Sequence, residues 1–142
     1  MNVFGDDWED AEDWSGGGAK SRPLVDPGVE LGATVYELGP ANFTVYHFHH
    51  GSEELLIVLS GRPTLRTPEG ERVLAEGEAV RFPAGPDGAH GIRNDTDEPV
   101  RLVVAGTRAS PEVVEYPDLG QITVQARTTS QTGERLWLIH DV

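Results

Sequence analysis

The most informative stretch of this 142-residue sequence is HFHHGSEE, residues 47–54, which gathers three histidines and two glutamates. His47 and His49 are two residues apart, so on a β-strand their imidazoles leave from the same face. Gly51 and Ser52 interrupt that strand, and a turn there can return Glu54 to the face that the histidines share. Neutral imidazoles and a carboxylate are common ligands of transition metals, so the stretch predicts part of a metal site.

The sequence around this stretch predicts one short strand after another, bounded by turns rich in Gly, Pro, Asn and Asp. The expected strands are 31–38, 42–49, 54–60, 63–66, 72–75, 79–83, 90–94, 100–107, 112–116, 122–126 and 136–140. No amphipathic helix interrupts them. Short strands without helical crossovers favour an all-β sandwich, jelly roll or closed barrel. The run from Leu55 to Leu59 is apolar on both faces and needs cover on both. We expect the barrel interior on one side and a second sheet, the N-terminal segment or another subunit on the other.

Composition excludes several classes of function. The chain contains no cysteine, which rules out disulfides, thiolate metal sites and cysteine nucleophiles. Its formal net charge of −13 makes nucleic acid and anionic membrane surfaces poor partners. No secretory signal pattern and no apolar run of about 20 residues is present, so we expect a soluble cytoplasmic protein.

Residues 1–23 differ from the rest, and we expect them to form an acidic N-terminal segment before a single barrel domain at residues 24–142. Two interpretations stay open. The segment is either a disordered acidic tail, with residues 15–18 as a flexible joint, or it docks on the barrel or on a partner subunit. Phe4, Trp8 and Ala11 at helical spacing, with Trp14 nearby, favour docking.

Two spaced motifs make the sequence resemble the cupin superfamily. Residues 47–61 read H-F-H, four residues, E, six residues, G. Residues 77–94 read G, five residues, P-A-G, four residues, H, three residues, N. The second motif has four residues before its histidine where two are common, and the first lacks its leading glycine because position 41 is Ala41. The sequence is most similar to small single-domain conserved-barrel (cupin 2-like) proteins.

The resemblance implies a double-stranded β-helix, the jelly-roll cupin barrel, with one divalent metal ion held by His47, His49, Glu54 and His90. Three imidazoles and a carboxylate suit Fe, Mn, Ni, Co or Zn. We expect a metal-dependent enzyme that acts on a small polar molecule, with dioxygenase chemistry ahead of isomerisation. The alternatives are a non-catalytic small-molecule-binding or sensing cupin, and a barrel whose metal is only structural. We also expect a homodimer.

Several nearby residues compete for roles. Glu53 competes with Glu54 as the carboxylate ligand, but the six residues between Glu54 and the glycine at 61 favour Glu54 and turn Glu53 outward. An enzyme also needs an acid or base beside the metal, for which Arg81 and His50 are candidates. Tyr46 is a third, but alternation along its strand places it with the outward-facing residues and disfavours it. The remaining residues have ordinary structural roles in our expectation. His50 faces solvent or the pocket mouth, Asn94 forms hydrogen bonds at a turn or strand end, Gly61 and Gly77 have positive φ, and His140 is on the surface. The acidic residues 112–118 could line a rim, but a solvated edge strand is favoured.

Overall fold

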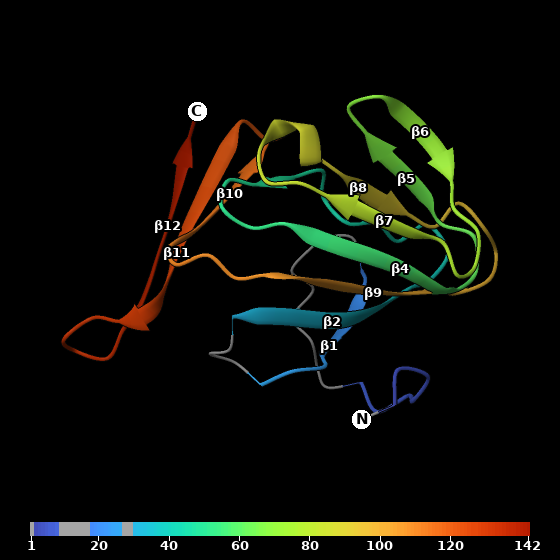
Figure 1. Cartoon of the computed structure of the whole chain (residues 1–142), viewed down its shortest axis with the longest axis horizontal. Coiled ribbons are helices and arrows are strands. Elements are labelled where there is room, and N and C mark those ends of the chain that lie inside the picture. The colour runs from blue at the N-terminus through green and yellow to red at the C-terminus, as the bar shows by residue number, and fades with distance from the viewer. Residues whose placement is uncertain (1, 9–17, 27–29) are drawn as a thin grey trace.

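One wall of the molecule is a five-stranded antiparallel sheet (Figure 1). The computed structural model describes residues 2–8, 18–26 and 30–142. The sheet has the order β1-β2-β9-β4-β7, with strands β1 (Lys20–Pro23), β2 (Leu31–Leu38), β9 (Val100–Thr107), β4 (Glu54–Ser60) and β7 (Ala79–Phe82). The bounds of β2, β4 and β9 are those that the sequence predicted. These three strands form the centre of the sheet.

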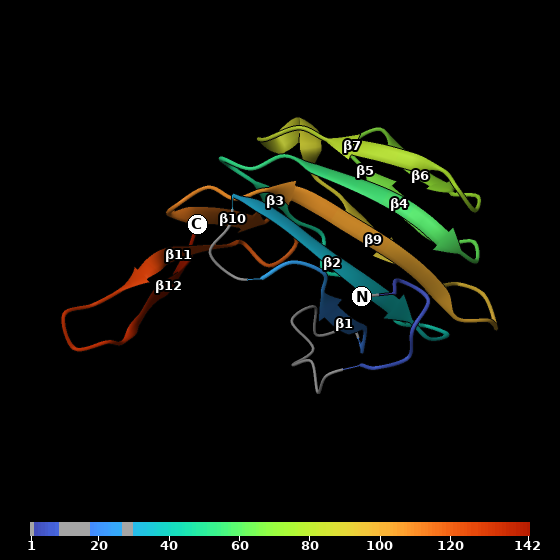
Figure 2. The same cartoon turned by 60° about the horizontal axis from the view of Figure 1, so that its bottom comes forward.

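Two smaller antiparallel sheets complete the fold (Figures 1 and 2). One has the order β12-β11-β10-β3, with β3 (Phe48–His49), β10 (Glu112–Tyr116), β11 (Gln121–Thr129) and β12 (Arg135–Asp141). The other has the order β6-β5-β8, with β5 (Thr64–Thr67), β6 (Gly70–Val73) and β8 (Gly91–Arg93). The only helical element described is one 3₁₀ turn, η1 (Pro86–Gly88). The all-β prediction is confirmed. No helix in the described part of the chain is long and apolar enough to cross a membrane.

The hydrophobic core lies between the five-stranded and three-stranded sheets. Leu56 and Val58 of β4 and Leu102 of β9 are almost completely buried, and they belong to one cluster with Leu65 of β5 and Ile92 of β8. Alternate residues of a strand share a face, so β4 sends Leu56 and Val58 inward together. Each such side chain contributes roughly 1.5–3 kcal/mol by leaving water.

Residues 42–47 depart from the strand that the sequence predicted over 42–49. Only Phe48 and His49 belong to β3, while Phe43 and His47 form isolated bridges with Arg93 and His90. The segment runs beside β8 but bonds to it only intermittently, for example from the Thr44 amide to the Ile92 carbonyl at 2.7 Å. The switch from the three-stranded to the four-stranded sheet takes place here, which explains why no regular ladder forms.

The N-terminal residues 2–8 dock on the outer side of the sheet. Asp7 pairs with Arg22, which is 2% exposed, and Asp6 pairs with Arg101 at 2.8 Å. The Trp8 ring lies 4.9 Å from the Arg101 guanidinium, a cation–π contact. Docking is therefore seen for Asp6, Asp7 and Trp8, whereas Phe4 is 61% exposed. Ala11 and Trp14 lie outside the described residues. Strand β1 adds residues 20–23 to the sheet, and the division of the chain at residue 23 stays a prediction.

Candidate metal centre

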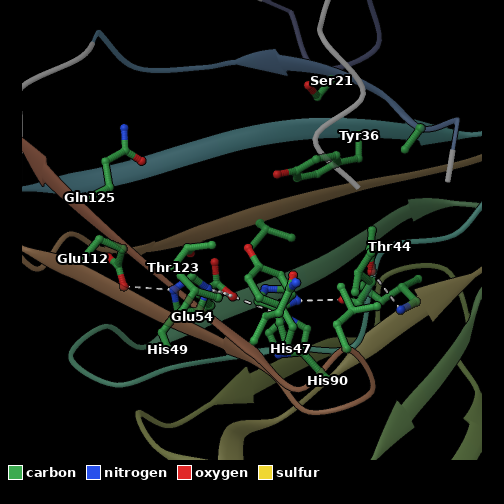
Figure 3. A pocket seen from close by; sticks show the side chains of 18 of the residues that line it. Ser21, Tyr36, Thr44, His47, His49, Glu54, His90, Glu112, Thr123 and Gln125 are labelled. Atoms are coloured by element: carbon green, nitrogen blue, oxygen red, sulfur yellow. Dashed lines mark hydrogen bonds and ion pairs between the residues drawn. The ribbon is translucent and has the colours of Figure 1, made fainter. Parts of the chain in front are cut away.

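Four side chains from separate parts of the chain meet at one end of the barrel (Figure 3). His47, His49 and Glu54 offer ligand atoms that all lie within 4.8 Å of one another. His90 joins them: its Nε2 is 3.3 Å from Glu54 Oε2, and its ring centroid is 4.6 Å from that of His47. The structure thus brings together all four residues that the sequence singled out as ligands.

Backbone pairing produces this convergence. His47 and His90 form a β-bridge and exchange two backbone hydrogen bonds, of 3.0 and 2.9 Å, which places their side chains together. His49 lies in β3, and Glu54 begins β4 after the turn at Gly51 and Ser52. The turn therefore returns Glu54 to the side that the histidines share.

Each histidine is held in one tautomer by a partner at Nδ1. His47 Nδ1 donates to the Val45 carbonyl at 2.8 Å, and His90 Nδ1 donates to the Gly88 carbonyl at 2.9 Å. His49 Nδ1 donates to Glu112 Oε1 at 3.0 Å. Because a carbonyl or carboxylate oxygen only accepts, each Nδ1 carries the proton. In a neutral ring the lone pair then lies on Nε2, the arrangement in which a ligating histidine uses its other nitrogen for an outer partner.

Two polar atoms at the centre of the cluster are buried without a hydrogen-bond partner: His49 Nε2 and Glu54 Oε2. They lie 3.4 Å apart. Leaving a buried polar group unsatisfied costs about 1–3 kcal/mol. A divalent cation between the imidazoles and the carboxylate would satisfy both atoms, so these residues fit a metal ion.

The protonation states follow from burial and from the neighbouring charges. Burial, helped by repulsion from His90 and His49, lowers the pKa of His47 to about 4. Burial also opposes charge on His49, but the hydrogen bond to Glu112 and the adjacent Glu54 carboxylate outweigh it and raise its pKa to about 9. Burial likewise opposes the Glu54 carboxylate, yet the adjacent imidazoles of His49 and His90, 3.4 and 3.3 Å from Oε2, hold its pKa well below the usual range. Without metal, the site holds a neutral His47, a charged His49 and an ionised Glu54 near neutral pH.

A cavity of about 690 Å³ opens from the cluster toward the four-stranded sheet. The histidines and Glu54 line one side of the cavity. Tyr36 of β2 and Ser21 of β1 lie on the opposite side (Figure 3). Hydroxyls and amides from Thr44, Thr123, Gln121 and Gln125 also line the cavity, as does the Glu112 carboxylate. Arg135 and Trp137 of β12 line the cavity as well. Apolar side chains make up the larger part of the lining, among them Val45, Ile92, Leu102 and Val104. The cavity therefore suits a small molecule that has apolar surface as well as a few hydrogen-bonding groups.

The competing residues lie elsewhere. Glu53 faces outward and pairs with Arg81 at 2.6 Å, so Arg81 does not face the cluster. His50 pairs with Glu115 at 3.0 Å on the outer side of the sheet. The Tyr46 ring lies under the Arg66 guanidinium at 3.9 Å, outside the cavity. None of the three side chains proposed as an acid or base beside the metal occupies that place.

The structural roles predicted for Asn94, Gly61, Gly77 and His140 are confirmed. The amide of Asn94 bonds the Leu38 and Glu98 carbonyls at 2.9 and 2.7 Å, which confirms its strand-end role. Gly61 and Gly77 have φ of 85° and 79°, as predicted. His140 is exposed on β12.

Tyr36 is a functional candidate that the sequence interpretation missed, and Glu112 entered it only as part of an acidic segment that could line a rim. The expectation of a solvated edge strand at 112–118 is wrong: β10 lies between β11 and β3, and Glu112, Val114 and Tyr116 line the cavity. The alternation of residues 112, 114 and 116 could have indicated a shared face. The pairing of that face with His49, some sixty residues earlier, could not be read from the sequence.

Comparisons with known proteins agree with this geometry. The cupin domain family model matches residues 34–106. A sugar phosphate isomerase from a cupin superfamily, from Silicibacter pomeroyi, is 27% identical with a TM-score of 0.75; the match covers 87% of this chain and 76% of that one. A putative sugar phosphate isomerase from Acidithiobacillus ferrooxidans is 31% identical with a TM-score of 0.74 and the same coverage. A polyketide cyclase from Streptomyces resistomycificus is 28% identical with a TM-score of 0.55, over 63% of this chain and 64% of that one. A search of curated proteins gave no match.

Proposed function

This chain belongs to the cupin family, and from that premise we propose that it is a metal-dependent enzyme that acts on a small polar molecule. His47, His49, Glu54 and His90 hold the ion. The main support for the proposal is that two buried ligand atoms, His49 Nε2 and Glu54 Oε2, have no hydrogen-bond partner. They lie among three imidazoles, each of which is oriented by a hydrogen bond at its Nδ1 atom. The ligand set suits Fe, Mn, Ni, Co or Zn.

Isomerisation of a hydroxy-carbonyl compound is the reaction that the cavity supports best. Such a reaction moves one proton between neighbouring carbons and one between their oxygens, and a bound divalent metal would polarise the carbonyl oxygen. Burial, with the nearby Glu54 charge, raises the pKa of Tyr36 to about 12, so its hydroxyl stays protonated. It can donate a hydrogen bond to a substrate oxygen across the cavity. The neutral hydroxyls and amides of the lining match a hydroxylated molecule. Two similar structures, one described as a sugar phosphate isomerase and the other as a putative one, support the same reaction class.

Dioxygenase chemistry at Fe(II) is the second candidate. It is supported by the ligand set itself, because a six-coordinate ion held by four side chains keeps two positions open for substrate and oxygen. The two reactions differ in what they consume. An oxygenase takes up molecular oxygen with its substrate, and an isomerase does not.

The first test is metal analysis. Protein purified without added ions, or reconstituted anaerobically with Fe(II) or Mn(II), should hold about one ion per chain, and His49→Ala should remove most of it. His140→Ala, on the exposed face of β12, is the matched control and should keep its metal. A wild-type chain that stays metal-free after reconstitution with several ions would overturn the proposal.

The second test is an activity screen of the reconstituted protein. Aldose–ketose interconversion is followed for free and phosphorylated sugars, and oxygen uptake is followed for diols, thiols and keto acids. We expect interconversion without oxygen uptake. Tyr36→Phe should then lower turnover by about 10²-fold or more while metal content is unchanged. Metal binding without turnover of any compound would favour the binding or sensing cupin instead.

We also propose that the protein is a homodimer. The support is apolar surface that the single chain leaves open: Leu136, Trp137, Leu138 and Ile139 of β12 are each 43–58% exposed. Leu55, on the outer face of β4, is 40% exposed. Contiguous exposed apolar residues mark interaction surfaces more often than isolated ones do. The cytoplasmic location stays a prediction.

A further inference from the structure

We propose that Glu112 is a positioning residue of the metal centre, which acts through His49; this inference rests on the proposed function. Glu112 lies on β10, and its carboxylate reaches the cavity beside His49 (Figure 3). It accepts a hydrogen bond from His49 Nδ1 at 3.0 Å, on the ring nitrogen remote from the cluster. Glu112 itself stands outside the ligand group of His47, His49 and Glu54.

Both oxygens of Glu112 are committed, which fixes the carboxylate in place. Oε1 accepts from His49, and Oε2 accepts from the Ser52 hydroxyl at 2.7 Å. Ser52 is 3% exposed, and its hydroxyl oxygen in turn accepts from the Ala109 amide at 3.0 Å. The chain from the Ala109 amide to His49 is therefore continuous. This chain of hydrogen bonds orients the His49 imidazole through Nδ1, on the side of the ring opposite to Nε2.

His49 differs from the other two histidines in the charge of this partner. Val45 and Gly88 offer neutral carbonyls to His47 and His90, whereas Glu112 offers a carboxylate. A carboxylate behind an imidazole fixes the tautomer and raises the basicity of the opposite nitrogen toward a metal ion. His49 Nε2 is also the imidazole nitrogen left buried and unpartnered at the centre of the cluster. Glu112 thus raises the metal affinity of His49, the histidine whose Nε2 is buried without a hydrogen-bond partner.

Beside β3 and β10, a second histidine–glutamate pair lies on the opposite face of the sheet. His50 follows β3, and its Nε2 pairs with Glu115 of β10 at 3.0 Å, the distance at which His49 pairs with Glu112. The His50–Glu115 pair is more exposed and lies away from the cluster. Replacing Glu115 therefore removes an equivalent glutamate–histidine contact without touching the site.

The experiment compares Mn(II) and Zn(II) binding by titration calorimetry in wild type, Glu112→Gln, Glu112→Ala and Glu115→Gln. Loss of an outer-shell partner typically weakens metal affinity by about 10–100-fold. We expect a loss in that range for Glu112→Ala, a smaller one for Glu112→Gln, which keeps an acceptor for Nδ1–H, and none for Glu115→Gln. Equal affinities in all four proteins would overturn the proposal.

Imidazole NMR separates positioning from a general structural role. In the Zn(II)-loaded wild type, the His49 Nδ1 proton should be visible and protected from exchange, and Glu112→Ala should lose that signal while those of His47 and His90 persist. If wild type binds no metal, the proposed function fails, but the metal-free protein still tests the inference. The His49 Nδ1 proton should then be protected from exchange in wild type and in Glu115→Gln and lose that protection in Glu112→Ala; equal protection in all three would refute the coupling.

Discussion

At the scale of single residues, Gly106 of β9 shows how closely the backbone approaches the candidate ligands. It pairs with Glu54 in the five-stranded sheet. A Cβ added there would lie 2.7 Å from the Glu53 carbonyl oxygen and 2.9 Å from Glu54 Cγ. The backbone oxygen cannot move without disturbing the start of β4. Because glycine has no Cβ, Gly106 gives the Glu54 side chain room to lie against β9.

We expect Gly106→Ala to displace Glu54 and weaken metal binding. Overpacking of this kind costs about 1–3 kcal/mol of unfolding free energy. Thermal unfolding and metal titration measure the two effects. Ala105→Ser, at the neighbouring position on the opposite face of β9, is the control and should change neither by much. Unaltered metal affinity in Gly106→Ala would show that Glu54 does not depend on this gap.

The pKa values of two histidines predict the pH dependence of the metal-free protein. His47 has a folded pKa of about 4, below its unfolded value near 6.5, so the unfolded chain binds more protons between these limits and stability rises with pH there. His49 has a folded pKa of about 9, above its unfolded value, so its contribution is full below pH 6.5 and is lost as pH rises through 9. Unfolding free energy should therefore peak near pH 6.5.

Chemical denaturation at intervals from pH 4 to pH 9.5 measures this profile, with metal removed by a chelator. His49→Gln should lose the descending limb above pH 6.5 and keep the ascending one. His140→Gln, on an exposed strand, should keep both limbs. Stability of the metal-free wild type that climbs steadily to pH 9 would contradict the assigned charge on His49.

At the scale of elements, β4 carries two neighbouring leucines with opposite surroundings. Leu56 is fully buried in the core, and Leu55 is 40% exposed on the outer face of the sheet. We expect Leu56→Ala to cost about 2–5 kcal/mol of unfolding free energy through the cavity that it leaves. Leu55→Ala should cost much less in the monomer. Urea denaturation compares the two, and equal losses would contradict the assignment of the inner face of β4.

Most elements could be predicted because their patterns are local. Strands β2, β4 and β9 follow from runs of apolar and β-branched residues between turns. Strand β1 was missed, because Lys20-Ser21-Arg22-Pro23 has no apolar alternation. It forms because β2 offers an edge and because Asp7 and Asn2 bind the two terminal guanidinium nitrogens of the buried Arg22. The ligand group could be predicted from spacing. Glu112 could not, since its role depends on the pairing of β10 with β3.

At the scale of the whole molecule, the hairpin of β11 and β12 extends beyond the barrel (Figures 1 and 2). If a second copy covers it, wild type should elute with twice the chain mass of 15.4 kDa in light scattering. Leu138→Glu, in the exposed centre of β12, should shift the protein to a monomer. Val73→Glu, at an equally exposed position of β6, is the control and should not. A monomeric wild type at high concentration would contradict the dimer.

The contact between His47 and His90 joins two distant points of the chain, and the whole of β4 to β7 lies between them. An ion that binds both residues closes this segment into a ring and so acts as a reversible cross-link. Holding the ends of so long a segment together removes freedom mainly from the unfolded chain. Loaded protein should then survive heat and proteases longer than stripped protein, and its lifetime should depend on the rate at which the ion escapes.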